Sequence, residues 1–233
     1  MLLGAWELIG QMRLVGMTWP PFSTVAAFLL DPSRSALFGR ALSATLSSAL
    51  VGYLIGAVAG LAFAMLGQIV PALRPGTDRA TAVIHAIPSI ALAPIFIVLL
   101  SRDAAPAALA TLNAFFVFYV SGASGFASST QTQRDLMLAL GASGLKRFIH
   151  VDLPAAFPGI VSGMKLAVPA ALIGAIIGEW FGAPRGLGIL IVNAMQNFQI
   201  PLLWSVVVLV AATSLILFAA MTFLERIVHE RYR

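Results

Sequence analysis

The chain has 233 residues, of which 60% are hydrophobic and only 10% are charged. Soluble domains carry about 25% charged residues, so this composition excludes an ordinary soluble domain and predicts an integral membrane protein. Lys and Arg outnumber Asp and Glu by 14 to 9, and in a membrane protein this excess belongs to cytoplasmic loops rather than to a nucleic-acid surface. The chain has no cysteine, which excludes disulfides, thiol catalysis and cysteine-based metal sites.

The N-terminal segment Met1–Met12 is apolar but too short to cross a bilayer at about 1.5 Å per residue. No basic region precedes it and no convincing small-residue cleavage site follows it, so we expect no cleavable signal peptide. We interpret it as a partial or short first helix. It is either the end of a longer helix or a tilted segment that continues past Arg13.

Five later windows have the length of about 20 mostly apolar residues that a membrane-spanning helix needs. We therefore predict an all-α integral membrane protein, with residues 1–233 forming a single transmembrane domain. Pro88, Pro94 and Pro169 lie inside these windows and predict kinks. The five predicted spans are Leu42–Leu66, Thr81–Leu100, Ala104–Phe126, Ile160–Trp180 and Leu202–Leu224.

Small residues recur at four-residue spacing in two of these regions, which lets helix backbones approach closely. We expect these stripes to pack mainly within the chain, with a dimer interface or a mobile helix contact as the alternative. The stripes are Ala44, Ser48, Gly52, Gly56 and Gly60, and Gly159, Gly163, Ala167, Ala171 and Ala175.

The most polar stretch separates the third and fourth predicted spans, at residues 127–160. Within it, we expect Leu136–Gly141 to form a short surface helix with Asp135 near its positive end. Met137 and Leu140 would give this helix a small apolar patch. The residues alone leave two interpretations open: a docking surface for a soluble partner, or a basic loop that touches only lipid headgroups.

The distribution of basic residues orients the chain. If this loop is cytoplasmic, nine basic residues lie on the cytoplasmic side and five on the outer side, which places the C-terminus in the cytoplasm. The cytoplasmic set is Arg74, Arg79, Arg134, Lys146, Arg147, Lys165, Arg226, Arg231 and Arg233. The outer set is Arg13, Arg34, Arg40, Arg102 and Arg185.

The loop also carries a specific motif. It holds the triplet Asp135-Leu136-Met137, then Gly141 six residues after the acid, and it ends in Val151-Asp152-Leu153-Pro154. This pattern resembles the EAA loop of the inner-membrane permeases of ATP-binding-cassette importers, whose signature is an EAA triplet, a spaced Gly and an I-x-L-P ending. The spacing matches throughout, although the triplet keeps only an acid at its first position.

Other segments extend the resemblance over nearly the whole chain from about Trp19. Gly178-Glu179-Trp180 and the following Gly186-Leu187-Gly188 look like this family, and the stretch from Ile87-Pro88-Ser89 to Pro94 resembles its nitrate, sulfonate and taurine branch. Ser101-Arg102-Asp103 departs from the family pattern, because it replaces the Gly-containing turn that is usual after the third helix.

The resemblance implies a permease subunit in the bacterial inner membrane with six spans, the first of them partial, and a cytoplasmic coupling helix between the fourth and fifth. It implies a cytoplasmic ATPase dimer that binds ATP and Mg²⁺, a periplasmic or lipid-anchored substrate-binding protein, and a second permease subunit, identical in a homodimer. The transported solute would be a small polar molecule or anion, or a pyrimidine-like vitamin precursor. The implied coupling residues are Asp135, Leu136, Met137, Leu140, Gly141, Ala142, Ser143, Phe148, Leu153 and Pro154.

Three further residues are candidates for the pathway or its gate. Glu179 is ionisable and lies near the outer end of a predicted span, where such a group is a functional candidate. The alternative for Glu179 is an interfacial side chain that is solvated or paired with Arg185. Trp180 would be either an interfacial anchor or a residue that faces substrate, and His85 either a hydrogen-bonded structural residue or part of the pathway.

The sequence offers little for a catalytic or metal site. It contains no G-x-x-x-x-G-K-[ST] phosphate loop, so we expect this chain neither to hydrolyse ATP nor to bind a cofactor. It has no G-x-S-x-G or H-E-x-x-H motif, and a lone His without nearby acids makes no metal site. The rival functions are a stand-alone secondary transporter, an intramembrane enzyme and a membrane scaffold without transport activity.

Overall fold

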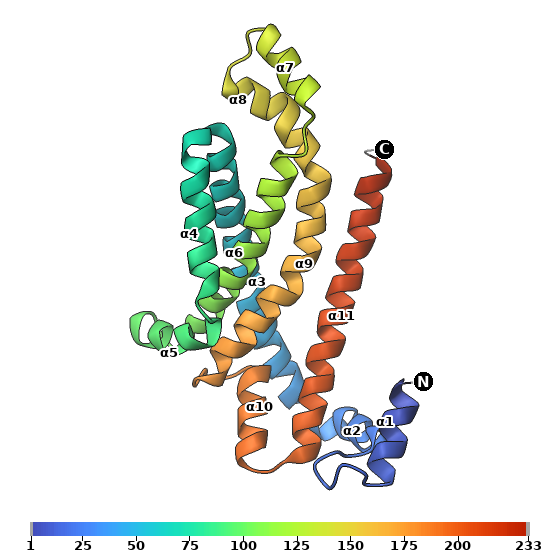
Figure 1. Ribbon diagram of the computed structural model, residues 1–233. Helices are drawn as coiled ribbons and strands as arrows, with labels where there is room; N and C mark the ends of the chain where they lie inside the picture. The colour runs from blue at the N-terminus through green and yellow to red at the C-terminus, as the bar shows by residue number, and fades with distance from the viewer. Residues whose placement is uncertain (1, 232–233) are drawn as a thin grey trace.

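The computed structural model describes residues 2–231, and this part of the chain is helical with no strand. The helices pack as a long bundle with short helical excursions at both ends (Figure 1). They are α1 (Leu2–Gln11), α2 (Phe22–Leu29), α3 (Ser35–Ile69), α4 (Arg74–Ala86), α5 (Ser89–Leu99), α6 (Ala105–Phe126), α7 (Gln131–Ala139), α8 (Gly144–Arg147), α9 (Leu153–Trp180), α10 (Leu187–Gln196) and α11 (Ile200–Arg231).

Four helices, α3, α6, α9 and α11, are long and apolar enough to cross a membrane. The α4–α5 pair reaches that length only when taken together, and its two helices meet at 90°. The break follows from Pro88, which disfavours helical conformation in the residue before it, and Ile87 accordingly ends α4 with an extended ψ of 120°. The predicted Thr81–Leu100 span is thus a broken pair, whereas the all-α membrane fold is confirmed.

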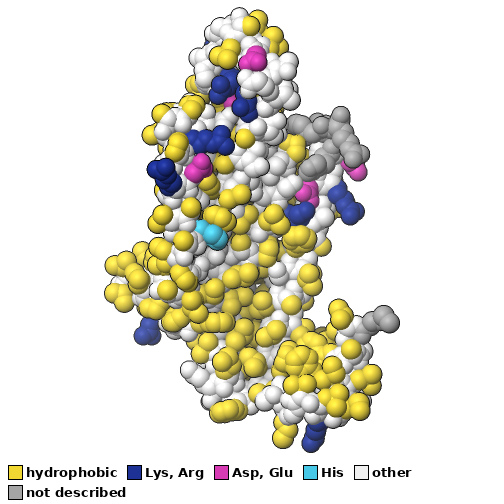
Figure 2. All heavy atoms as spheres, in the orientation of Figure 1, with side chains coloured by type: hydrophobic (Ala, Val, Ile, Leu, Met, Phe, Trp, Pro, Cys, Tyr) yellow, Lys and Arg dark blue, Asp and Glu magenta, His cyan; other side chains and the backbone are white. Residues whose placement is uncertain are grey.

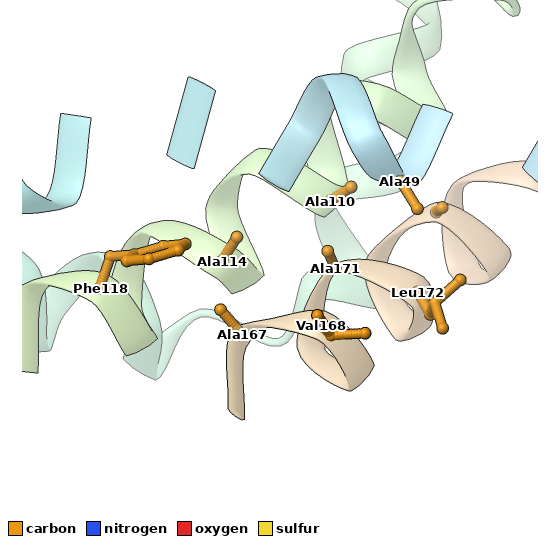
Figure 3. Close-up of a cluster of buried hydrophobic side chains, with 9 residues drawn as sticks. Ala49, Ala110, Ala114, Phe118, Ala167, Val168, Ala171 and Leu172 are labelled. Carbon is orange, nitrogen blue, oxygen red and sulfur yellow. The ribbon is translucent and has the colours of Figure 1, made fainter. Parts of the chain in front are cut away.

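The centre of the bundle is formed by α3, α6 and α9, which pack through small side chains. A Cβ atom at Gly56 of α3 would lie only 2.8 Å from the Cβ of Ala114 in α6, so the two backbones are close. Figure 3 shows Ala114 and Phe118 of α6 beside Ala167 and Ala171 of α9. The predicted small-residue stripes therefore pack mainly inside the chain, as expected, although Ala44 and Ser48 at one end of the α3 stripe are only half-buried.

Helix α11 contacts α9 through a polar cluster at one level of the bundle. Lys165 Nζ of α9 lies 2.6 Å from Glu225 Oε2 of α11, and Ser162 Oγ donates to Glu225 Oε1 at 2.6 Å. The Lys165 ammonium also lies 5.5 Å from the centroid of the Phe218 ring. Lys165, which the topology argument counted among the cytoplasmic charges, is therefore an interhelical group whose side chain is 20% exposed.

We expect Lys165→Met to destabilise the chain, because its partner Glu225 has a side chain only 15% exposed. Breaking a buried pair costs about 3–5 kcal/mol, and the residual exposure here lowers the expectation to about 2 kcal/mol. Thermal unfolding of Lys165→Met, Glu225→Gln and the double variant measures the coupling. Asp31→Asn is the control, because the Arg34–Asp31 pair is about one-third exposed and should contribute about 0.5 kcal/mol. Strictly additive effects at Lys165 and Glu225 would refute the link.

The N-terminal hairpin of α1 and α2 lies at the end of the bundle where α11 begins (Figure 1). Neither helix is long enough to span a membrane, in agreement with the prediction of a short first element. Glu7 accepts bonds from the N–H and hydroxyl of Ser23, at 2.8 and 2.7 Å. The rings of Trp6 and Trp204 pack edge to face with centroids 5.0 Å apart, and Trp204 Nε1 donates to Thr18 O.

Charged side chains are unevenly distributed along the bundle. Figure 2 shows most of the visible Lys, Arg, Asp and Glu toward the end that carries α7 and α8, beyond a wide apolar belt. Helix α11 runs from the α10 end toward this charged end (Figure 1). Arg233, one of the predicted cytoplasmic charges, lies outside the described residues.

Candidate functional site

The polar loop folds as a compact projection at one end of the bundle (Figure 1). Its first helix, α7, begins at Gln131 because Thr130 and Gln133 form a reciprocal capping box, each side chain bonding the other's backbone N–H. The predicted helix start at Leu136 was therefore wrong. Asp135 lies in the middle of α7 rather than at its positive end, and its carboxylate accepts a bond from Gln131 Nε2 at 2.8 Å.

Gly141 reverses the chain after α7. It has a φ of +69°, which is favourable for glycine. Its N–H donates to Leu138 O and the next N–H, of Ala142, donates to Met137 O, both at 2.9 Å, which is a Schellman ending. Ser143 then caps α8 by accepting from the Lys146 N–H. Local hydrogen bonds fix the turn, and no other group lies within 4 Å of the position that a Cβ of residue 141 would take.

Leucine side chains are exposed around this turn. Leu136 is 58% exposed, Leu140 71% and Leu145 54%. Met137, predicted to form the patch with Leu140, is half-buried instead, as is Ala142. An exposed apolar cluster beside polar residues marks an interaction surface. Of the predicted coupling residues in α7 and the turn, Asp135, Leu136, Leu140, Gly141 and Ser143 face outward.

Phe148 lies on the opposite, inward side of the loop. It is 3% exposed and packs against Phe126 of α6 with ring centroids 5.1 Å apart. Ala64 of α3 and Ala156 of α9 belong to the same buried cluster. Phe148 thus fastens the loop to the bundle. Leu153 and Pro154 lie at the start of α9 and are exposed.

A buried carboxylate, Asp152, holds the base of the loop. Its side chain is completely buried, and it accepts bonds from Ser129 Oγ at 2.7 Å and from Gln68 Nε2 at 2.9 Å. Arg147 Nε lies 3.4 Å from the same group and forms an ion pair. Arg134 joins the network by donating to Ser129 Oγ at 2.9 Å. One carboxylate therefore ties both ends of the loop to α3.

Asp152, Gln68 and Ser129 were not among the predicted site residues. Asp152 occupies the unspecified position of the I-x-L-P ending, and the available signal was an acid placed directly before a long apolar run. A carboxylate at that position must be hydrated or bonded internally, because an unpaired buried charge is costly. That argument predicts a partner for Asp152 but does not identify Gln68.

Glu179 lies at the other end of α9 and is only 1% exposed. Its Oε2 accepts from the Gly188 N–H at 2.7 Å and from Thr45 Oγ1 at 3.1 Å, and Thr45 Oγ1 accepts from the Leu187 N–H at 2.8 Å. Within the described residues its Oε1 has no partner. Glu179 is buried, and within residues 2–231 it forms no ion pair with Arg185. The alternative that Glu179 is an interfacial side chain, solvated or paired with Arg185, was therefore wrong. The carboxylate instead joins α9, α3 and the start of α10.

The remaining two pathway candidates lie apart from this cluster. His85 of α4 is exposed and its ring stacks on Phe116 of α6, with centroids 3.5 Å apart. Trp180 ends α9 and is 38% exposed. Over residues 2–231 no group of three His, Asp or Glu could hold a metal ion.

Residues 52–233 match the family described as binding-protein-dependent transport system inner membrane component. The chain belongs to this family. It is 29% identical over 230 residues to the formylaminopyrimidine transport permease protein ThiX of Halalkalibacterium halodurans, a match that covers 97% of this chain and 91% of ThiX. It is 25% identical to the putative aliphatic sulfonates transport permease protein SsuC of Bacillus subtilis, covering 97% of this chain and 82% of SsuC.

The fold agrees with that membership. A chain of the inward-facing MetNI methionine ABC transporter matches with a TM-score of 0.73 at 20% identity, covering 85% of this chain and 99% of that chain. The chain is a permease subunit of an ATP-binding-cassette importer, an all-helical inner-membrane component. The resemblance drawn from the loop motif is confirmed, and the stand-alone secondary transporter is not favoured.

Proposed function

We propose that residues 1–233 form one permease domain whose Asp135–Pro154 loop docks on a cytoplasmic ATPase dimer and transmits its closure to the bundle. The ATP and Mg²⁺ bind to that partner. A second, identical permease subunit completes the substrate path, and a periplasmic or lipid-anchored binding protein delivers the solute. The loop end and the C-terminal end of α11 then lie in the cytoplasm.

The observation that carries this proposal is an exposed apolar surface on a rigid support. Leu136, Leu140 and Leu145 are exposed, while Phe148 and Asp152 anchor the same loop in the bundle. A surface that binds a partner and is fastened at its base can pass a displacement to the packed helices behind it. An ordinary headgroup loop requires no such buried anchor.

The solute is expected to be a small polar molecule or anion. ThiX is named for formylaminopyrimidine transport and SsuC for aliphatic sulfonates transport. The nitrate import permease protein NrtB of Leptolyngbya laminosa is 26% identical over 212 residues. These names cover a neutral heterocycle and two kinds of oxyanion, so they define a class of small polar solutes.

The first experiment is purification of the tagged chain from its own host in mild detergent, with identification of the co-purifying proteins by mass spectrometry. A soluble ATPase in near-equal amount supports the proposal. An intact, stable chain without an ATPase contradicts it and gives the loop another use.

A substitution at the loop surface tests the docking site directly. We expect Leu140→Glu to reduce the amount of bound ATPase by about tenfold, because a charge replaces an exposed apolar contact at a protein interface. Met17→Glu is the matched control, since Met17 is 83% exposed in the N-terminal hairpin. Full ATPase recovery with Leu140→Glu would place the docking surface elsewhere.

A further inference from the structure

A polar cavity of about 390 Å³ lies at the end of the bundle opposite the α7–α8 loop. Three arginines from separate parts of the chain line it: Arg40 of α3, Arg102 between α5 and α6, and Arg185 between α9 and α10. Segments that are distant in the sequence therefore bring three exposed arginines to the wall of one open hollow.

These charges are not neutralised within the described residues. None of the three guanidinium groups lies within ion-pair distance of a carboxylate there, and Asp103 is the single acid in the cavity wall. Arg40 uses its Nε to bond Ala36 O. The lining therefore carries a net positive charge. Ser43 and Ser47 donate their hydroxyls to Arg40 O and Ala44 O of their own helix, whereas the hydroxyl of Ser48, which also lines the cavity, can serve as a donor.

The other two basic residues assigned to this end of the molecule differ from these three. Arg34 is paired with Asp31 at 3.5 Å, and its guanidinium stacks on the Phe28 ring at 3.5 Å from the centroid. Arg13 is exposed in the N-terminal hairpin and does not line the cavity. The convergence of Arg40, Arg102 and Arg185 is thus a property of the cavity rather than of the whole surface.

The wall that carries Arg185 is held in place from behind. The turn of residues 181–186 precedes Leu187 and Gly188, whose N–H groups bond Thr45 and the buried Glu179. This connection fixes the turn against α3, the helix that supplies Arg40 and the serines. Pre-organised donors bind an anion with less loss of conformational freedom than mobile ones.

We infer that this cavity is an entry site for a small oxyanion, such as a sulfonate, nitrate or carboxylate. A guanidinium group presents a planar fork of N–H donors that matches the oxygens of such a head group, and the Ser48 hydroxyl can bond the remaining oxygen. The volume falls in the range of about 300–1,000 Å³ that is usual for small-molecule sites. A neutral heterocycle would gain nothing from the charge.

The inference rests on the proposed function, because the orientation proposed there, with the α7–α8 loop in the cytoplasm, makes this end of the bundle the outer face. There the cavity would receive the anion before it enters the path. Since the α7–α8 loop is at the far end, anion binding and ATPase docking can be measured separately.

The test uses the full-length chain in lipid nanodiscs without a binding protein. Sodium methanesulfonate is titrated at constant ionic strength by calorimetry, and dimethyl sulfone serves as the neutral analogue of the same shape. We expect saturable binding of methanesulfonate alone. Arg40→Gln, Arg102→Gln and Arg185→Gln should each weaken it by about tenfold, because each removes a charge-assisted hydrogen bond.

Two further variants sharpen the result. Asp103→Asn should tighten binding by about twofold to fivefold, since it removes the acid from the cavity wall. Arg13→Gln removes the same charge as the cavity variants from the same end of the molecule and should leave binding unchanged. Equal weakening by Arg13→Gln, or equal binding of dimethyl sulfone, would overturn the inference.

Absence of saturable binding to the unaltered chain would also overturn it. If the same arginine variants then impair stimulation of ATP hydrolysis by the binding protein, the cavity recognises acidic side chains of that protein instead. If the unaltered chain binds methanesulfonate but co-purifies with no ATPase, the proposed function is refuted and the oxyanion site stands. If the ATPase co-purifies but methanesulfonate does not bind, the oxyanion site is refuted and the proposed function stands.

Discussion

Replacing Asp152 by alanine is expected to uncouple transport from ATP hydrolysis and to lower the thermal stability of the permease. The carboxylate is fully buried and bonds Ser129, Gln68 and Arg147, so its removal leaves three donors without their acceptor. Loss of one partner from a buried charged network costs about 3–5 kcal/mol, and the 22% exposure of the Arg147 side chain favours the lower end. The loop would then move without displacing the bundle.

The measurements are the unfolding temperature and, after reconstitution with the ATPase and binding protein, uptake and ATP hydrolysis. Asp152→Asn retains the volume and one acceptor oxygen, so its effect should be intermediate. Glu230→Ala is the control, because Glu230 is an exposed acid near the C-terminal end of α11 and lies outside the loop. Normal uptake and unfolding temperature in Asp152→Ala would mean that the loop is not anchored through this residue.

The parts of the fold that depend on local composition were predictable. Apolar windows of about 20 residues gave the spans, because a bilayer requires that length whatever the tertiary contacts are. The α4–α5 pair shows the limit of this argument. Hydropathy treats Thr81–Leu100 as one segment, whereas Pro88 divides it into helices that meet at 90°. Proline gave the position of the break but not its angle, which depends on packing against neighbouring helices.

The coupling loop shows a similar division. Its position followed from the motif, and the start of α7 was present in the sequence as the capping pair Thr130 and Gln133. The buried contacts that anchor the loop and the opposite end of α9 could not be predicted in the same way. Gln68 bonds Asp152 across 84 residues of chain, and Thr45 bonds Glu179 across 134. A single sequence contains no signal for such pairs, because their proximity results from helix packing.

The largest local effect at the other end of the molecule is expected from Gly186→Ala. Gly186 has a φ of +142°, a conformation that costs an L-residue about 1–3 kcal/mol. Because Gly186 has no side chain, the Glu179 carboxylate occupies the space in which a Cβ of residue 186 would lie, so an alanine there would overlap this carboxylate. That carboxylate is bonded to Thr45 and to the Gly188 N–H, so it cannot withdraw without losing both contacts. We expect a loss of about 3 kcal/mol or more in stability, together with loss of uptake.

Two variants separate the contributions to this effect. Gly39→Ala is the control, since Gly39 lies in α3 with no positive φ and nothing within 4 Å, so alanine there should be neutral or slightly stabilising. The double variant Gly186→Ala with Glu179→Ala removes the overlap but keeps the backbone strain. If steric conflict with the carboxylate dominates, the double variant will be less destabilised than the sum of the two single changes. Additive losses would instead assign the effect to the backbone of the turn, and the steric conflict with the Glu179 carboxylate would be refuted.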